Sequence, residues 1–262
     1  FYSSIRYFSV EWIINEIRSL MKFGVEFICF FDDVFAVNKP RLRKFLALMQ
    51  QEGLTTKVKL YANSKADVID DEICQLLLKL NLKTIFFGFE SGSPKILKYL
   101  KCDKVSMEDN YKAILLGRKY NIRIFGNVII GSPGETVDDI QQTIDFVNWA
   151  WRNKASRITA SILIPYPGTE IWKVAKEMGR VSDTMNFDKL TVNAEGDNLD
   201  GYVTTLSPEE FRTMALKTIK AIHKYKWRKV KEFLLDSPLD TIVFLFKAPW
   251  PLIRRMFIRT SV

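Results

Sequence analysis

The sequence predicts an α/β fold in which parallel strands alternate with helices, either as an open doubly wound sheet or as part of a (β/α) barrel. Short runs rich in β-branched and aromatic residues recur through the first two thirds of the chain, as strands covered on both faces require. Stretches with helical spacing of apolar residues lie between these runs. The repeated alternation implies parallel strands that are joined by right-handed crossovers.

The elements follow one another in a regular order. A predicted helix over Val10–Lys22 precedes the first strand. The predicted strands are Val25–Phe31, Lys57–Ala62, Thr84–Phe89, Ile122–Ile130 and Ile158–Ile164. The predicted helices after them are Lys39–Glu52, Asp70–Leu80, Ser106–Tyr120, Thr136–Arg152 and Gly168–Met178. Because the chain opens on a helix, we expect the first βα unit to lack its strand.

Helix boundaries carry capping chemistry. Asn38 precedes Pro40 at one predicted start, and Ser106 precedes an acidic first turn at another. Thr136 precedes Asp138 and Asp139, whose charges suit a helix amino terminus. The sequence therefore fixes where these helices begin.

The alternation stops after Gly179. Residues Phe187–Asp200 are rich in Asn, Asp and Gly and predict irregular structure. Ser207 and Pro208 then predict a helix that runs to about Leu235. We therefore divide the chain into a partial barrel over 1–190, a helical basic extension over 191–236 and an amphipathic, aromatic tail over 237–262.

Composition excludes several classes of protein. The 262 residues are 47% hydrophobic, which suits a sizeable core and excludes a disordered chain. No apolar run reaches the roughly 18 residues of a membrane span, and no signal peptide opens the sequence. Three dispersed cysteines argue against a disulfide framework and for a reducing cytosol. The first residue is Phe1 and not Met, so we expect a piece of a longer protein.

The net charge of +9 is concentrated near the end of the chain. Seven Lys and Arg residues and no acid lie between Lys217 and Lys231, interleaved with apolar residues at helical spacing. Such a helix can lie on a membrane surface, contact nucleic acid, or pack on the barrel with its lysines solvated. Aromatic residues beside Arg254 and Arg255 in the tail favour peripheral membrane contact over nucleic acid.

Polar or glycine-rich turns follow all five predicted strands, at the edge where parallel α/β folds bind ligands. The candidate ligand-binding residues in these turns are Asp32, Asp33, Asn63, Ser64, Gly88, Glu90, Ser91, Gly131, Pro133, Gly134, Glu135, Pro165, Gly168 and Thr169. Strand parity places Gly88 and Glu90 on one face, so the glycine leaves space beside a carboxylate that can accept hydrogen bonds from a ligand. The alternative for Glu90 is a helix cap or a surface salt bridge.

The other turns have ordinary structural alternatives. Gly131–Thr136 is also typical of the punctuation between a strand and a helix. Tyr166–Thr169 predicts a type II turn in which Thr169 caps a helix. The pair Asp32 and Asp33 can bind a metal or end a strand. The single histidine, His223, excludes His-based triads and His-rich metal sites.

Taken together, Phe31–Phe35 with Asn38 and Arg41, and the blocks Gly88–Ser93, Gly131–Thr136 and Pro165–Glu170, resemble the radical S-adenosylmethionine (SAM) superfamily. More narrowly, they are similar to its cobalamin-binding-domain branch. The resemblance implies a partial (β/α) barrel that holds SAM and a [4Fe-4S] cluster. The cluster reduces SAM to a 5′-deoxyadenosyl radical, which abstracts a hydrogen from the substrate.

The resemblance also assigns residues to parts of SAM. Asp32 and Asp33 match the region near the methionyl amino group, and Asn63 and Ser64 the region near the carboxylate. The strand end with Gly88, Glu90 and Ser91 matches the ribose region. The turn with Gly131, Pro133, Gly134 and Glu135 matches the adenine region, which Pro165, Gly168 and Thr169 flank.

The chain departs from the family in one respect. The family binds its cluster through C-x-x-x-C-x-x-C after the first strand, and no such motif occurs here. We therefore expect the chain to start just after those cysteines, with the cluster ligands outside it and the cobalamin-binding domain further upstream. Without three thiolates the chain alone is expected to be inactive.

The functional hypothesis is a cytoplasmic, membrane-associated radical SAM enzyme that performs methyl transfer or a related reaction. Its expected cofactors are SAM, the [4Fe-4S] cluster and cobalamin, and its expected partners are a small-molecule or lipid-like substrate and an electron donor protein. One alternative is a non-catalytic barrel that binds nucleic acid or a membrane surface. Another is a different (β/α) barrel with a phosphate at Gly131–Thr136.

Overall fold

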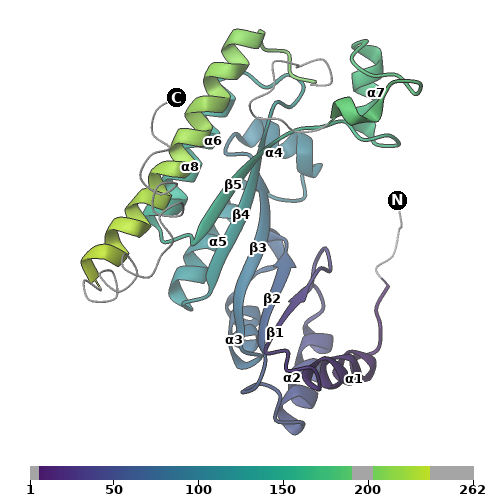
Figure 1. Ribbon diagram of the computed structural model, residues 1–262, viewed down its shortest axis with the longest axis vertical. Helices are drawn as coiled ribbons and strands as arrows, with labels where there is room; N and C mark the ends of the chain where they lie inside the picture. The colour runs from purple at the N-terminus through teal and green to yellow at the C-terminus, as the bar shows by residue number, and fades with distance from the viewer. Residues whose placement is uncertain (1–5, 191–202, 237–262) are drawn as a thin grey trace.

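The computed structural model describes residues 6–190 and 203–236 (Figure 1). The strands are β1 (Phe27–Phe30), β2 (Lys59–Ser64), β3 (Leu82–Glu90), β4 (Arg123–Ile130) and β5 (Arg157–Ile162). The helices are α1 (Val10–Met21), α2 (Lys39–Gln51), α3 (Asp71–Lys79), α4 (Pro94–Lys101), α5 (Met107–Lys119), α6 (Val137–Arg152), α7 (Glu170–Glu177) and α8 (Pro208–Asp236). All five strands and all seven long helices that the sequence predicts are therefore confirmed.

The five strands form one parallel sheet in the order β1-β2-β3-β4-β5. A doubly wound sheet would reverse its strand order at a switch point, whereas a barrel adds each strand beside the previous one. The sequential order therefore selects the partial (β/α) barrel. β1 pairs with β2 alone within the described residues, so its outer edge is open there.

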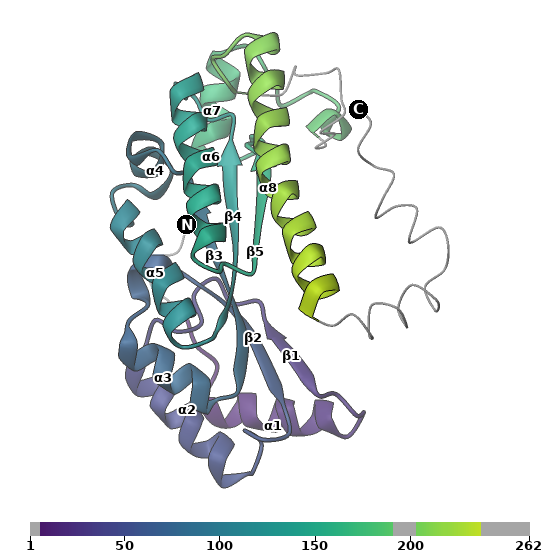
Figure 2. The same ribbon diagram turned by 90° about the vertical axis from the view of Figure 1, so that its left-hand side faces the viewer.

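Several of the helices cover one face of this sheet, whereas α7 lies apart from it (Figure 1). Figure 1 shows α3, α5, α6 and α8 on the same side, and Figure 2 shows this helical layer in front of the strands. The covered face is buried, with Leu60, Phe87 and Phe89 completely inaccessible to solvent. Alternate residues such as Phe86 and Phe125 point to the other, concave face and are only half-buried. This alternation leaves a partly open face for ligands.

Side-chain caps start the helices where the sequence predicts them. Asn38 accepts a hydrogen bond from the Arg41 amide at 2.9 Å. Ser106 and Thr136 each form a reciprocal capping box, with Asp109 and Asp139 respectively. Ser207 accepts from the Glu210 amide at 3.3 Å at the start of α8. These caps satisfy amide groups that the first helical turn leaves without a partner.

The first half of α8 packs on the barrel. Phe211, Met214 and Ala221 contact buried residues of β4 and α6, including Ile130 and Ile140. Figure 2 shows α8 running beside α6 and β5. His223 and Lys220 are exposed, as expected for the solvated side of an amphipathic helix. The division of the chain at residue 190 stays a prediction. The role of the basic segment beyond His223 also stays a prediction, because the structure does not describe its side chains.

Three short elements were not predicted from the sequence. They are α4 and the 3₁₀ turns Ala66–Val68 and Phe187–Leu190, the last of which begins the stretch that we expected to be irregular. The rest of that stretch and the aromatic tail lie outside the described residues. Within the described residues, the helices are too short or too polar to cross a lipid bilayer.

Candidate functional site

The carboxyl ends of the five parallel strands meet at one edge, and the candidate residues lie along it. The loop after β1 reaches the end of β2, where the Phe35 amide donates to the Asn63 carbonyl at 3.0 Å. Asp32 and Asp33 lie on this loop with exposed side chains. No group of three metal-ligating side chains gathers anywhere in the described ranges, so the structure offers this aspartate pair no further ligands.

The two candidates at the end of β2 lie on opposite faces of the sheet. Asn63 is half-buried and pairs in register with Phe86 on the concave face. Ser64 lies on the helix-covered face, 4% exposed, and its hydroxyl has no hydrogen-bond partner among the described residues. Only Asn63 is therefore directed toward the open side of the barrel.

The Glu90 carboxylate lies directly over Gly88. A Cβ atom at Gly88 would lie 2.2 Å from Glu90 Oε1, so the missing side chain makes room for the carboxylate. A register shift between Gly88 and Glu90, and a φ of 59° at Glu90, allow the side chain to fold back in this way. The prediction that Gly88 leaves space beside Glu90 is confirmed by this contact.

Lys101, at the end of α4, donates to Glu90 Oε1 at 2.7 Å. The two side chains are 21% and 16% exposed, so the pair is largely but not completely sheltered from solvent. Glu90 thus forms a salt bridge, but a sheltered one and not the surface salt bridge that is the alternative prediction for this residue. This salt bridge does not exclude ligand binding, because a carboxylate has a second oxygen that can accept a hydroxyl donor.

Ser91 follows Glu90 and is completely buried. Its hydroxyl contacts the Thr143 hydroxyl at 3.0 Å and accepts from the Ser93 amide at 3.0 Å. In this structure the Ser91 side chain therefore serves the packing between β3 and α6, and its predicted contact with ribose stays a prediction.

The turn after β4 is braced from within by Glu135. One carboxylate oxygen accepts from the Gly131 amide at 2.5 Å and from the Ser132 amide at 3.0 Å. Glu135 is 1% exposed, and this burial raises its pKa to about 7 against the two amide hydrogen bonds, which lower it. Gly131 and Gly134 have φ values of 90° and 68°, which glycine adopts without strain.

This geometry separates the candidates of the turn into two groups. Glu135 points inward, and its other oxygen and the Ser132 hydroxyl are buried without hydrogen-bond partners in the described part of the chain. Pro133 is half-buried and Gly134 is exposed with open space around its Cα, so these two form the accessible rim. The alternative prediction, a turn that links a strand to a helix, is also confirmed, because Thr136 caps α6 directly after the turn.

The turn after β5 matches its structural prediction. The Thr169 amide donates to the Tyr166 carbonyl at 3.2 Å, and Gly168 has a φ of 83°, as a type II turn requires. Thr169 caps α7 by accepting from the Trp172 amide at 3.1 Å. Pro165 is buried, whereas Gly168 is exposed.

The sequence did not single out a polar group on the concave face of β4 and β5. Asn127 Oδ1 accepts from the Thr159 hydroxyl at 2.8 Å and from the Ser161 hydroxyl at 3.3 Å. Asn127 is the register partner of Gly88, so this group lies beside the Glu90 carboxylate on the same face. The sequence signal that could have revealed this group is the presence of polar residues at inward-facing positions inside two predicted strands.

The parallel sheet with its interleaved helices matches the partial (β/α) barrel of radical SAM domains. The family model of the radical SAM superfamily matches residues 1–147, and the chain belongs to that superfamily. The chain is 30% identical over 184 residues to an uncharacterised methyltransferase of Pyrococcus horikoshii, a match that covers 70% of this chain and 39% of that protein.

One further relative is similar to this chain in sequence, and one solved structure is similar to it in fold. Bacteriochlorophyllide d C-12(1)-methyltransferase of Chlorobaculum tepidum is 27% identical over 248 residues, which are 92% of this chain and 50% of that protein. The solved structure of TsrM, a radical SAM methyltransferase of Kitasatospora setae, superimposes with a TM-score of 0.58 at 18% identity, over 68% of this chain and 37% of that one. This chain therefore spans half or less of the length of these relatives.

The cysteines of the chain do not form a cluster site. Cys74 is buried in α3, where desolvation raises the pKa of its thiol to about 12, so it does not supply a thiolate at neutral pH. Cys29 and Cys102 are exposed and lie in different elements, β1 and the end of α4. A [4Fe-4S] cluster takes its protein ligands from several gathered cysteines, and these three thiols do not fit one.

Proposed function

We propose that the carboxyl edge of this sheet binds SAM and presents it for reductive cleavage in an enzyme that transfers a methyl group to an organic substrate. The observation that carries the proposal is the Glu90 carboxylate, held over Gly88 on the half-open concave face beside the turns of the neighbouring strands. A sheltered carboxylate is suited to accept hydrogen bonds from vicinal hydroxyls such as those of a ribose.

The proposed cofactors are SAM, a [4Fe-4S] cluster and cobalamin. When bound, the cluster would supply the electron that cleaves SAM. Its thiolate ligands would come from residues other than Cys29, Cys74 and Cys102. This chain would bind and orient SAM through Asp32, Asp33 and Asn63 near the amino acid moiety, Glu90 near the ribose, and Pro133 and Gly134 near the base. Membership of the superfamily supports these roles.

Calorimetric titration of the chain with SAM tests the proposal. Glu90→Ala should weaken SAM binding by about tenfold or more, the loss expected for one hydrogen bond to a charged group. Glu26→Ala is the matched control, because Glu26 is an exposed glutamate just ahead of β1, at the opposite edge of the sheet. Equal SAM affinity in the wild type and in folded Glu90→Ala would remove Glu90 from the site.

The chemistry has its own test. A protein in which this chain is joined to a C-x-x-x-C-x-x-C segment should, after anaerobic reconstitution, show cluster absorbance and form 5′-deoxyadenosine from SAM. Folded protein that does neither would refute the enzyme hypothesis and favour a non-catalytic binding module.

The proposed partners are a small organic methyl acceptor and an electron donor protein in the cytoplasm. Methyltransferases among the relatives support the reaction class. We also propose peripheral membrane contact through the basic segment that begins at Lys217, in preference to nucleic acid. Vesicles with anionic lipid should co-sediment the chain in a salt-sensitive manner, whereas binding that ignores lipid charge would count against this contact.

A further inference from the structure

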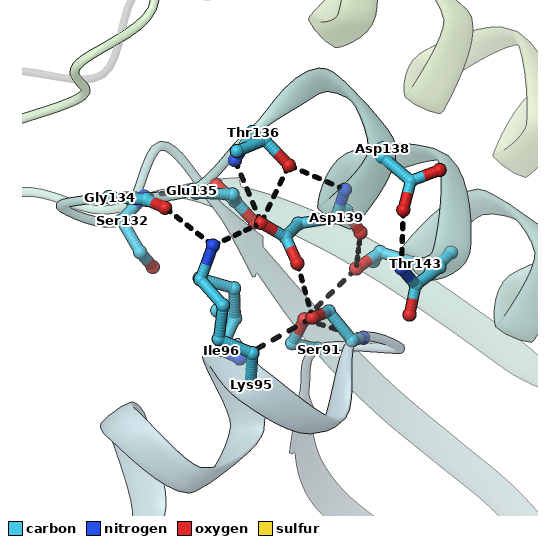
Figure 3. Close-up of polar contacts among 12 residues, drawn as sticks. Ser91, Lys95, Ile96, Ser132, Gly134, Glu135, Thr136, Asp138, Asp139 and Thr143 are labelled. Atoms are coloured by element: carbon cyan, nitrogen blue, oxygen red, sulfur yellow. Dashed lines mark hydrogen bonds and ion pairs between the residues drawn. The ribbon is translucent and has the colours of Figure 1, made fainter.

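Two turns that carry candidate SAM contacts meet over the start of α6 (Figure 3). One is Ser91–Ser93 after β3, and the other is Gly131–Glu135 after β4. Asp139 lies between them, 5% exposed. Its Oδ1 accepts from the Ser93 hydroxyl at 2.6 Å, and its Oδ2 accepts from Lys95 Nζ at 2.8 Å and from the Thr136 amide at 2.9 Å. Both carboxylate oxygens are therefore engaged in joining the two turns.

Thr143 continues this junction one helical turn further along the same face of α6. Its hydroxyl accepts from the Gly92 amide at 3.0 Å, contacts the Ser91 hydroxyl at 3.0 Å and donates to the Asp139 carbonyl at 3.2 Å. Because the Thr143 proton is used in the last bond, the Ser91 hydroxyl must be the donor to Thr143. Every hydroxyl proton in this buried chain thus has an acceptor.

Gly92 brings the first turn into direct contact with the helix backbone. A Cβ atom at Gly92 would lie 2.4 Å from the Gln142 carbonyl oxygen and 2.7 Å from Thr143 Cα. Lys95 completes the link to the second turn, because its Nζ also donates to the Gly134 carbonyl at 2.8 Å. These contacts therefore hold both loops, the one after β3 and the one after β4, against the first two helical turns of α6.

The contacts of Ser91–Ser93 with α6 determine where Glu90 lies. Glu90 immediately precedes Ser91 and has a φ of 59°, a left-handed conformation that surrounding contacts must hold in a non-glycine residue. The Phe89 carbonyl, next to it, accepts from the Ser91 amide at 2.8 Å and from the Asn110 side chain at 3.1 Å. Releasing Ser91–Ser93 from α6 would free the backbone at Glu90 and with it the carboxylate.

We propose that Asp139 and Thr143 are positioning residues that hold Glu90 and the Gly131–Glu135 turn at a fixed separation, so that one nucleoside can contact both. The inference rests on the proposed function, since it names SAM as the ligand that spans the two turns. Neither side chain would touch the ligand; each would act through the backbone that it holds.

Asp139→Asn tests the proposal against Asp138→Asn. Both variants remove one negative charge from the first turn of α6, but Asp138 is exposed and contacts only the Gln142 side chain, at 2.7 Å, among the described residues. We expect Asp139→Asn to weaken SAM binding about tenfold, whereas Asp138→Asn leaves it within about twofold of the wild type. Affinity is measured by titration calorimetry at a temperature where circular dichroism shows each variant to be folded.

Thr143 provides a second, independent variant. Thr143→Val keeps the shape of the side chain but loses the hydroxyl, and should weaken SAM binding severalfold. Thr143→Ser keeps the hydroxyl and should restore the affinity. If Asp139→Asn fails to fold, this pair of variants decides the question.

A double-mutant cycle separates positioning from general stability. Because Asp139 acts through Glu90 in part, Asp139→Asn should cost less SAM affinity in the Glu90→Ala background than in the wild type. Folded Asp139→Asn and Thr143→Val variants that bind SAM as tightly as the wild type would overturn the positioning role of these two residues and leave the proposed function unaffected. A wild-type chain that binds no SAM would overturn the proposed function first, and this inference with it.

Discussion

Gly88→Ala is predicted to impair SAM binding without weakening the fold. The new methyl group would lie 2.2 Å from Glu90 Oε1, whereas ordinary contact begins near 3.4 Å, so the oxygen must withdraw by about 1.2 Å. The atom that must move is the end of a flexible side chain, so the strand itself need not shift. Alanine is also favoured over glycine inside a strand by roughly 0.5–1 kcal/mol. The melting temperature should therefore stay constant or rise slightly.

Ligand binding should change in the opposite direction. Because the substitution acts through Glu90, it should cost no more SAM affinity than Glu90→Ala does, and a loss of severalfold to about tenfold is expected. The 2.7 Å ion pair between Glu90 and Lys101 would also be disturbed. Titration calorimetry measures the affinity and differential scanning calorimetry the stability. Unchanged SAM affinity in a folded Gly88→Ala variant would refute the placement of Glu90 in the site, as would an equal loss in the Glu90→Ala background.

Three further predictions concern pH, stability and thiol reactivity. Burial raises the folded-state pKa of Glu135 to about 7 from an unfolded value near 4.5, so the contribution of this group to the free energy of unfolding should fall by about 3 kcal/mol as pH rises from 4.5 to 7. Urea unfolding of the wild type and of Glu135→Gln measures this contribution as the difference between their pH slopes, and equal slopes would contradict the prediction. Gly92→Ala should destabilise the fold by about 1–3 kcal/mol, because its methyl group meets helix backbone that cannot withdraw; an unchanged melting temperature would argue against the packing of this turn. A thiol reagent should modify Cys29 and Cys102 in the native chain and Cys74 only after denaturation. Rapid modification of all three cysteines in the native chain would contradict the burial of Cys74.

The strands and long helices could be predicted because their signals are local. Most of the strands are short runs rich in β-branched or aromatic residues, and each of the helices after Asn38, Ser106 and Thr136 begins at a side chain that caps it. Strand order is not local, since the same alternation of elements fits a doubly wound sheet or a barrel. The family resemblance, and not the periodicity, favoured the barrel that the sheet order then confirmed.

Helix α4 was not predicted from the sequence, although Ser93 and Pro94 are a typical helix start. It spans eight residues, with Ile96 and Leu97 as its buried apolar side chains, so its apolar pattern extends over only about two helical turns. Missing α4 also hid Lys101, so the ion pair at Glu90 could be foreseen only as a general possibility.

The candidate residues at the strand ends were chosen by position, and position does not distinguish accessible from buried side chains. Glu135 and Ser91 stand in polar turns, yet both are buried and serve the packing of those turns. Asp139 was noted for its charge at a helix start, and its contacts with Ser93 and Lys95 depend on how two distant turns meet. Such contacts are tertiary and leave no signal in a single sequence.

Hydrogen–deuterium exchange with and without SAM tests the central claim most directly. If the carboxyl edge binds SAM, protection should appear at Gly88–Ser93 and Gly131–Thr136, while α1 and the amino ends of the strands stay unchanged. Saturating SAM that protects neither turn, or that protects only segments away from this edge, would contradict the account.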